Sequence, residues 1–169
     1  MARQPVAASS ASRRSAKDRA LDLLAYRSRS REEIRRRLSR AGFEEDEIGT
    51  ALDDLERVGL VDDERFAREL ATYQVGGKGA GRRLALGALR QAGVDTETAE
   101  RAVAEAAGDD EQDRAEELAR SRARRLSGLE ERVAFQRLVG FLMRRGYEGE
   151  VARTAARRAL VGETTDPDG

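Results

Sequence analysis

Three glycines divide this chain into segments of nearly equal length, and they constrain its fold more than any other feature. Gly42, Gly93 and Gly146 lie 51 and 53 residues apart. An apolar residue precedes each glycine by eight residues and a leucine precedes it by four; the pairs are Ile34 and Leu38, Ala85 and Leu89, and Leu138 and Leu142. This spacing indicates one face of an α-helix, and a glycine in the left-handed conformation commonly ends a helix. The sequence therefore predicts three equivalent helices that end at these glycines.

A further helical pattern stands on each side of these three helices. The helices that come first are predicted over residues 16–27, 62–75 and 111–126. In the second of these, Phe66, Leu70 and Tyr73 form the predicted core face. Another stripe with helical spacing follows each glycine, so the repeating unit consists of three helices.

The predicted fold is all-α, with three tandem three-helix repeats that form an elongated, curved helical array. One such unit is too small to bury its apolar faces alone, and stacking against a neighbour supplies the missing core. Ser30 with Glu33 predicts a helix cap, and Asp62 or Asp63 predicts another. The predicted boundaries are 16–59, 60–108 and 109–161 for the repeats, and 1–15 and 162–169 for disordered tails.

Missing residue types exclude several classes of chemistry. The 169 residues include no cysteine and no histidine, which excludes disulfides, thiolate or imidazole metal sites and catalytic triads built on either residue. Pairs of adjacent aspartates fit helix caps and solvated faces better than catalysis. We therefore expect no enzyme activity, no cofactor and no metal. Because there is no long apolar run and no signal peptide, we expect a soluble, cytoplasmic protein without a membrane partner.

Charge alternates along the chain although the net charge is zero. Residues 28–43 carry +4, residues 65–94 carry +5 and residues 119–158 carry +7, while the two intervening stretches are strongly acidic. The basic stretches contain the middle helix of each predicted repeat. An exposed basic face of this kind is a candidate surface for phosphate groups or for an acidic protein.

The second repeat gives the clearest candidate. No acidic residue lies between Glu69 and Asp95, so the sequence predicts that the basic side chains of this stretch have no local partner. In the first repeat, Glu32 and Glu33 precede Arg36 and Arg37 by four residues, so a solvated face of ion pairs explains them equally well. The predicted contact residues for a partner or for a DNA backbone are Lys78, Arg82, Arg83, Arg90, Arg137, Arg144, Arg145, Arg36 and Arg40.

Two other interpretations of this surface are less favoured. The glycine-rich stretch 74–94 does not fit a nucleotide-binding loop, because Lys78 is followed by glycine rather than by serine or threonine. No aromatic residue is expected on the exposed helix faces, so contact with a nucleic acid backbone is favoured over base stacking.

Four stretches together resemble the RecX family. They read "RSRSREEIRRRLSRAGF", "LERVGLVDDERFARELATYQ", "KGAGRRLALGALRQAGV" and "FLMRRGYEGEVARTAARRAL", and the resemblance spans about residues 16–160. The combination of "LVDDERFA", a glycine-containing turn and a later "FLMRRGY" carries the resemblance, since no single piece is specific. Members of this family are regulatory proteins that act on the bacterial recombinase RecA in DNA repair, homologous recombination and the SOS response.

The resemblance implies tandem three-helix repeats and a binding place in the groove of the RecA filament on single-stranded DNA. It also implies inhibition of strand exchange, of DNA-stimulated ATP hydrolysis and of the co-protease role of RecA. We expect the chain to act as a monomer. Two alternatives stay open: a general DNA-binding protein with helix-turn-helix-like pairs that bind duplex DNA, and a scaffold that contacts only proteins.

Overall fold

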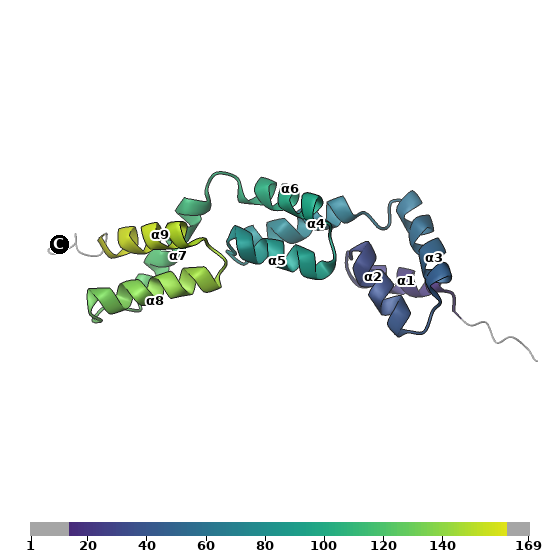
Figure 1. Cartoon of the computed structure of the whole chain (residues 1–169), viewed down its shortest axis with the longest axis horizontal. Helices are drawn as coiled ribbons and strands as arrows, with labels where there is room; N and C mark the ends of the chain where they lie inside the picture. The colour runs from purple at the N-terminus through teal and green to yellow at the C-terminus, as the bar shows by residue number, and fades with distance from the viewer. Residues whose placement is uncertain (1–13, 162–169) are drawn as a thin grey trace, which may run out of the picture. The chain divides into compact units, whose positions relative to one another are not determined.

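The computed structural model describes residues 14–161, which are helical and contain no strand. The predicted tails fall almost entirely outside these residues, at 1–13 and 162–169. The described chain divides into two compact units between Val61 and Asp62. Figure 1 labels α1–α3 in the first unit and α4–α9 in the second. The fold is all-α and built from three-helix sets, as predicted.

The first unit consists of one three-helix set. Its helices are α1 (Ala16–Tyr26), α2 (Arg31–Arg40) and α3 (Glu45–Arg57). The Ser30 hydroxyl accepts a hydrogen bond from the Glu33 N–H at 3.0 Å, which confirms the predicted cap of α2. Ser15, which the sequence assigned to the tail, caps α1 by accepting from the Asp18 N–H at 3.1 Å. The apolar faces of the three helices enclose one core around Ile34, Leu38 and Leu52.

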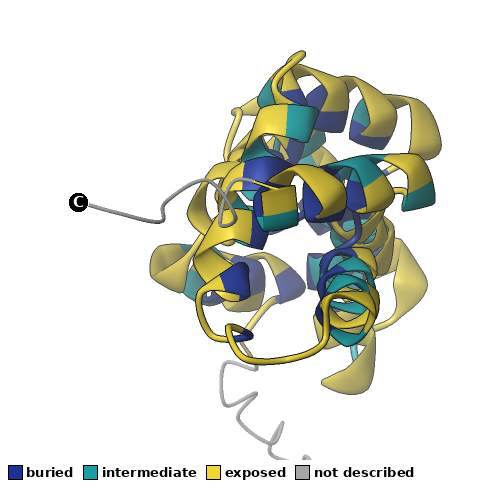
Figure 2. Ribbon diagram, turned by 90° about the vertical axis from the view of Figure 1, so that its left-hand side faces the viewer, coloured by how far each residue is buried: buried dark blue, intermediate teal, exposed yellow. Residues whose placement is uncertain are grey.

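The second unit contains two three-helix sets. The first of these sets comprises α4 (Asp63–Thr72), α5 (Arg82–Ala92) and α6 (Thr96–Ala107), and a π-helical turn, η1 (Tyr73–Gly77), extends α4. The last set comprises α7 (Glu111–Ala123), α8 (Glu131–Arg144) and α9 (Gly149–Val161). Each set has its own cluster of buried residues, one around Leu89 and the other around Leu138. Figure 2 shows buried residues on the inner helix faces and exposed residues on the outer ones.

The three repeat-defining glycines have the predicted conformation. Gly42, Gly93 and Gly146 follow α2, α5 and α8 with φ values of 88°, 83° and 90°. Residues with a side chain rarely adopt this left-handed conformation, so glycine is the residue that ends each helix. The residue after Gly146, Tyr147, is fully buried in the core of the last set. The glycine therefore turns the chain so that Tyr147 points inward.

The prediction that Tyr73 belongs to a core face is wrong, because its side chain is 57% exposed. Phe66 is buried as predicted, and the other buried positions of this stretch are Ala67, Ala71 and Val75, which recur every four residues. Tyr73 lies two residues from both Ala71 and Val75, roughly 200° around an α-helix from each of them. The expectation that no aromatic residue is exposed is wrong for the same reason, and Tyr26 is 89% exposed as well.

Candidate functional site

The predicted contact residues of α5 are bound within the second unit. Arg82 Nε lies 2.9 Å from Glu111 Oε2, and Arg82 Nη2 donates to the Gly108 carbonyl at 2.7 Å. Arg83 Nη2 donates to the carbonyl of Met143, at the end of α8, at 2.9 Å. The prediction that these arginines have no partner is therefore wrong. Glu111 and Met143 belong to the next three-helix set and Gly108 follows α6, so all three partners lie far from these arginines in the sequence.

The backbone around Gly81 makes contacts of the same kind. The Gly81 N–H donates to the Arg145 carbonyl at 2.8 Å, and the Arg83 N–H donates to the Gly146 carbonyl at 3.2 Å. A Cβ atom on Gly81 would lie 2.5 Å from backbone atoms of Gly146 and Tyr147. Only glycine allows this approach. The contacts of Gly81, Arg82 and Arg83 with the last helix set are called the junction below.

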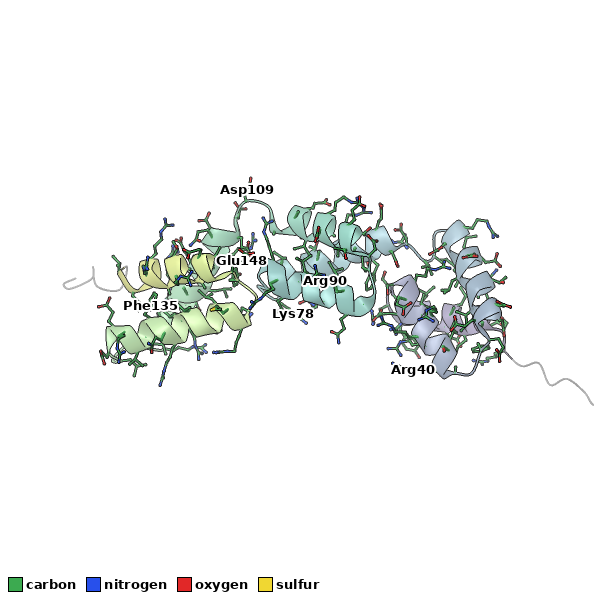
Figure 3. The ribbon with its side chains drawn as sticks, in the orientation of Figure 1. Arg40, Lys78, Arg90, Asp109, Phe135 and Glu148 are labelled. Atoms are coloured by element: carbon green, nitrogen blue, oxygen red, sulfur yellow. The ribbon has the colours of Figure 1, made fainter. Side chains whose placement is uncertain are left out.

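Lys78 and Arg145 lie beside the junction, and Figure 3 shows Lys78 where the two helix sets of the second unit meet. Arg145 Nη1 donates to the Lys78 carbonyl at 2.5 Å, while the Lys78 Nζ lies 5.0 Å from the centroid of the Tyr73 ring. The Tyr147 hydroxyl donates to the Gly79 carbonyl at 3.2 Å. Burial raises the pKa of Tyr147, so this hydroxyl keeps its proton and remains a donor.

Arg36 and Arg90 have acidic neighbours. Arg36 Nε donates to Glu32 Oε1 at 2.8 Å. Hydrogen bonds from Arg35 and then from Arg36 outweigh desolvation and lower the pKa of Glu32 to about 2. Arg90 Nη2 lies 3.9 Å from Glu100 Oε1, and both side chains are more than half exposed, so this pair is weak. The predicted ion-paired face of α2 is thus confirmed for Arg36.

Arg40, Arg137 and Arg144 differ from the other predicted residues. All three side chains are exposed, and none forms an ion pair with another residue in the described range 14–161. Arg40 ends α2 in the first unit, where Figure 3 labels it. Arg137 and Arg144 lie two turns apart on α8, so they project from the same face of the helix. Two exposed arginines without an ion pair among the described residues therefore share one face of α8.

A groove of about 400 Å³ runs along this face of α8. Its lining consists of Arg122 and Leu126 before α8 and of Val133, Gln136, Arg137, Gly140, Phe141 and Arg144 on it. No acidic residue of the described chain lines it. Two guanidinium groups lie near the Phe141 ring, with Arg122 Cζ at 5.5 Å and Arg145 Cζ at 5.4 Å from its centroid. This set of residues is called the α8 groove below.

The α8 groove has the features of an anion site. Arginine offers several N–H donors in one plane and matches the oxygen atoms of a phosphate group. Gly140 provides a place on the helix surface without a side chain, since only Arg144 Nη1 lies within 4 Å of the position of its missing Cβ. The sequence identified Arg137 and Arg144, but it did not indicate that Arg122, Gly140 and Phe141 share one groove with them.

Two further features of the described residues concern metals and membranes. No group of three or more acidic residues among them is placed to hold a metal ion. None of the helices within residues 14–161 is both long and apolar enough to cross a membrane. A second hollow, of about 760 Å³, lies between the start of α8 and the end of α9, and residues of both charges line it.

Comparison with known families matches each three-helix set to a different model. Residues 16–55 match the first three-helix domain of RecX, residues 62–103 the second and residues 109–155 the third. These ranges contain helices α1–α3, α4–α6 and α7–α9, apart from the last residues of each set. The repeats found from the glycines therefore correspond to the domains of this family.

Individual relatives agree with this match. The regulatory protein RecX of Amycolatopsis mediterranei is 39% identical over 145 residues, which cover 86% of this chain and 83% of the relative. That of Mycolicibacterium smegmatis is 38% identical over 152 residues, covering 88% and 81%. The crystal structure of RecX from Lactobacillus salivarius superimposes with a TM-score of 0.77 at 21% identity, over 86% of this chain and 95% of that one. With three domain models matched in order and relatives of this identity over most of its length, the chain belongs to the RecX family of regulatory proteins.

Proposed function

We propose that this protein regulates the recombinase RecA by binding the filament that RecA forms on single-stranded DNA. It inhibits strand exchange, DNA-stimulated ATP hydrolysis and co-protease activity, and it acts as a cytoplasmic monomer without enzyme activity of its own. The observation that carries the proposal is the α8 groove, which presents Arg122, Arg137 and Arg144 without an acidic neighbour in its lining. Membership of the RecX family supports the same role.

The charge pattern of the chain fits a partner made of protein and nucleic acid. Basic stretches alternate with acidic ones while the net charge is zero. A filament groove offers phosphate groups and charged protein side chains of both signs, so each face of the ligand can meet its complement. Several contact places along one chain add affinity without requiring that any one of them bind tightly.

The test measures ATP hydrolysis by RecA on single-stranded DNA with sub-stoichiometric amounts of this protein. We expect the wild-type chain to slow hydrolysis, and we expect Arg137→Ala/Arg144→Ala to weaken that inhibition because it empties the α8 groove of two charges. Arg132→Ala/Arg157→Ala is the matched control, since these arginines line the other hollow together with Glu130 and Glu131. An unchanged rate with the wild-type protein would contradict the proposal.

The same assay, together with a measurement of binding to duplex DNA, distinguishes the proposed function from that of a general DNA-binding protein. That alternative predicts tight, salt-sensitive binding to naked duplex DNA without RecA, and no dependence of the effect on the recombinase. The α5 arginines are poor reporters in either case. Because Arg82 and Arg83 hold the junction, replacing them destabilises the second unit as well as changing its surface charge.

A further inference from the structure

We infer that the second unit binds single-stranded nucleic acid directly, with phosphate groups in the α8 groove and one unpaired base on the ring of Tyr73. This inference rests on the proposed function, in which the DNA strand of the filament is one partner. It names the residues that contact that strand. It also goes beyond that function, because binding of this kind does not require RecA.

The groove supplies the phosphate contacts. Arg137 and Arg144 are two turns apart on α8, about 10.5 Å along the helix axis, so their long side chains can contact different phosphates of one extended strand. Arg122 approaches from the end of α7 and lies against the Phe141 ring. Since no acidic residue of the described chain lines the groove, its guanidinium groups are free to exchange water for phosphate oxygens.

A continuous series of contacts leads from the groove to Tyr73. The Phe141 ring in the groove carries the guanidinium of Arg145, whose Nη1 donates to the Lys78 carbonyl at 2.5 Å. The Lys78 ammonium lies 5.0 Å from the Tyr73 ring centroid. Contacts of Arg145 and Lys78 therefore connect Phe141 of the groove with Tyr73.

The exposed ring of Tyr73 favours binding of a single strand over binding of a duplex. Its ring is 57% exposed and begins the π-helical turn Tyr73–Gly77, a kind of turn that occurs frequently at functional sites. The neighbours Gly76 and Gly77 carry no side chain, so the ring stays accessible beside them. An exposed aromatic ring stacks unpaired bases of any sequence, whereas the bases of a duplex are already stacked on one another.

The test measures binding of the full-length protein to a fluorescently labelled thirty-nucleotide oligothymidylate by anisotropy, without RecA. We expect Arg137→Ala/Arg144→Ala to weaken binding roughly tenfold at 0.1 M salt and to reduce the slope of log affinity against log salt by about 1.4, because two phosphate contacts are lost. The charge-matched control Arg132→Ala/Arg157→Ala should retain the wild-type slope.

Two further variants test the geometry without changing the charge. Gly140→Leu places a side chain in the groove and should weaken binding, while Gly87→Leu, at a helical glycine of α5 with open space around it, should not. Tyr73→Leu should weaken binding to the oligothymidylate roughly fivefold and leave the weaker binding to a duplex of equal length unchanged.

The outcomes separate this inference from the proposed function. If the wild-type chain inhibits RecA but does not bind the oligothymidylate, or if the groove variants bind it as the wild type does, the inference is wrong and the proposed function stands. If the wild-type chain binds the oligothymidylate through the groove but leaves RecA unaffected, the proposed function is wrong and the site stands. Equal losses with Gly140→Leu and Gly87→Leu would also overturn the site.

Discussion

Arg82 and Arg83 on α5 and Arg137 and Arg144 on α8 occupy the middle helices of neighbouring three-helix sets, but their surroundings differ. The first pair donates to Glu111, Gly108 and Met143 and holds the two sets together. The second pair lines a groove without an acidic residue of the described chain. Four arginines that look alike in the sequence thus divide into two structural ones and two that are available to a ligand.

The difference shows that local charge does not predict which basic side chains are free. Glu111 follows Arg82 by 29 residues, and Met143 follows Arg83 by 60. Both partners arrive through the packing of one helix set on another, which no local pattern encodes. Residues 74–94, which include no acidic residue, were the better candidate for a free basic surface. In the structure, however, Arg82 and Arg83 of this stretch have partners within the second unit.

The junction glycines should give the largest effect on stability. In Gly146→Ala, the new Cβ would lie 2.4 Å from Leu84 Cβ and 2.5 Å from Leu84 N, in addition to the strain of a φ of 90°. We expect a loss of about 3 kcal/mol in the free energy of unfolding of the second unit, measured by urea unfolding followed by circular dichroism.

Gly42→Ala is the matched control for this change. Gly42 ends α2 with a φ of 88°, but nothing lies within 4 Å of its missing Cβ. Its replacement should cost about 1 kcal/mol, which is the backbone strain alone. Equal losses for the two variants would mean that the close approach at Gly146 contributes nothing and that the junction is not a tight contact.

The arginines themselves should give the next largest effect. Arg82→Ala leaves Glu111, whose side chain is only 13% exposed, without its ion-pair partner, and should lower the free energy of unfolding by about 1 to 2 kcal/mol. Arg137→Ala should change stability by less than about 0.5 kcal/mol, because it removes an exposed side chain without an ion pair in the described chain. Thermal unfolding measures both. The division into structural and available arginines fails if Arg137→Ala is the more destabilising.

Much of the fold could be predicted from the sequence because it depends on short spacings. The stripe of Leu38 and its equivalents, the caps at Ser30 and Asp62 and the glycines after the middle helices involve residues no more than eight positions apart. The exposure of Tyr73 was missed because the buried face continues from Phe66 through Ala67 and Ala71 to Val75, whereas the larger Leu70 and Tyr73 lie beside it. The α8 groove was missed in part because Arg122 reaches it from α7 across the turn that separates the two helices.

The arginine face of α2 is a third case, in which the charges are balanced locally, and changing it should cost less than Arg82→Ala. Glu32 accepts from Arg35 Nε at 2.8 Å and from Arg36 Nε at 2.8 Å, and its pKa falls from 4.5 to about 2. A carboxylate with a lowered pKa stabilises the fold fully above its unfolded pKa, and this contribution is lost as the pH falls toward 2. Glu32→Gln should therefore cost about 1 kcal/mol at pH 7, and the variant and wild-type unfolding midpoints should converge between pH 4.5 and pH 2. A difference that persisted unchanged at pH 2 would show that Glu32 acts through packing rather than charge.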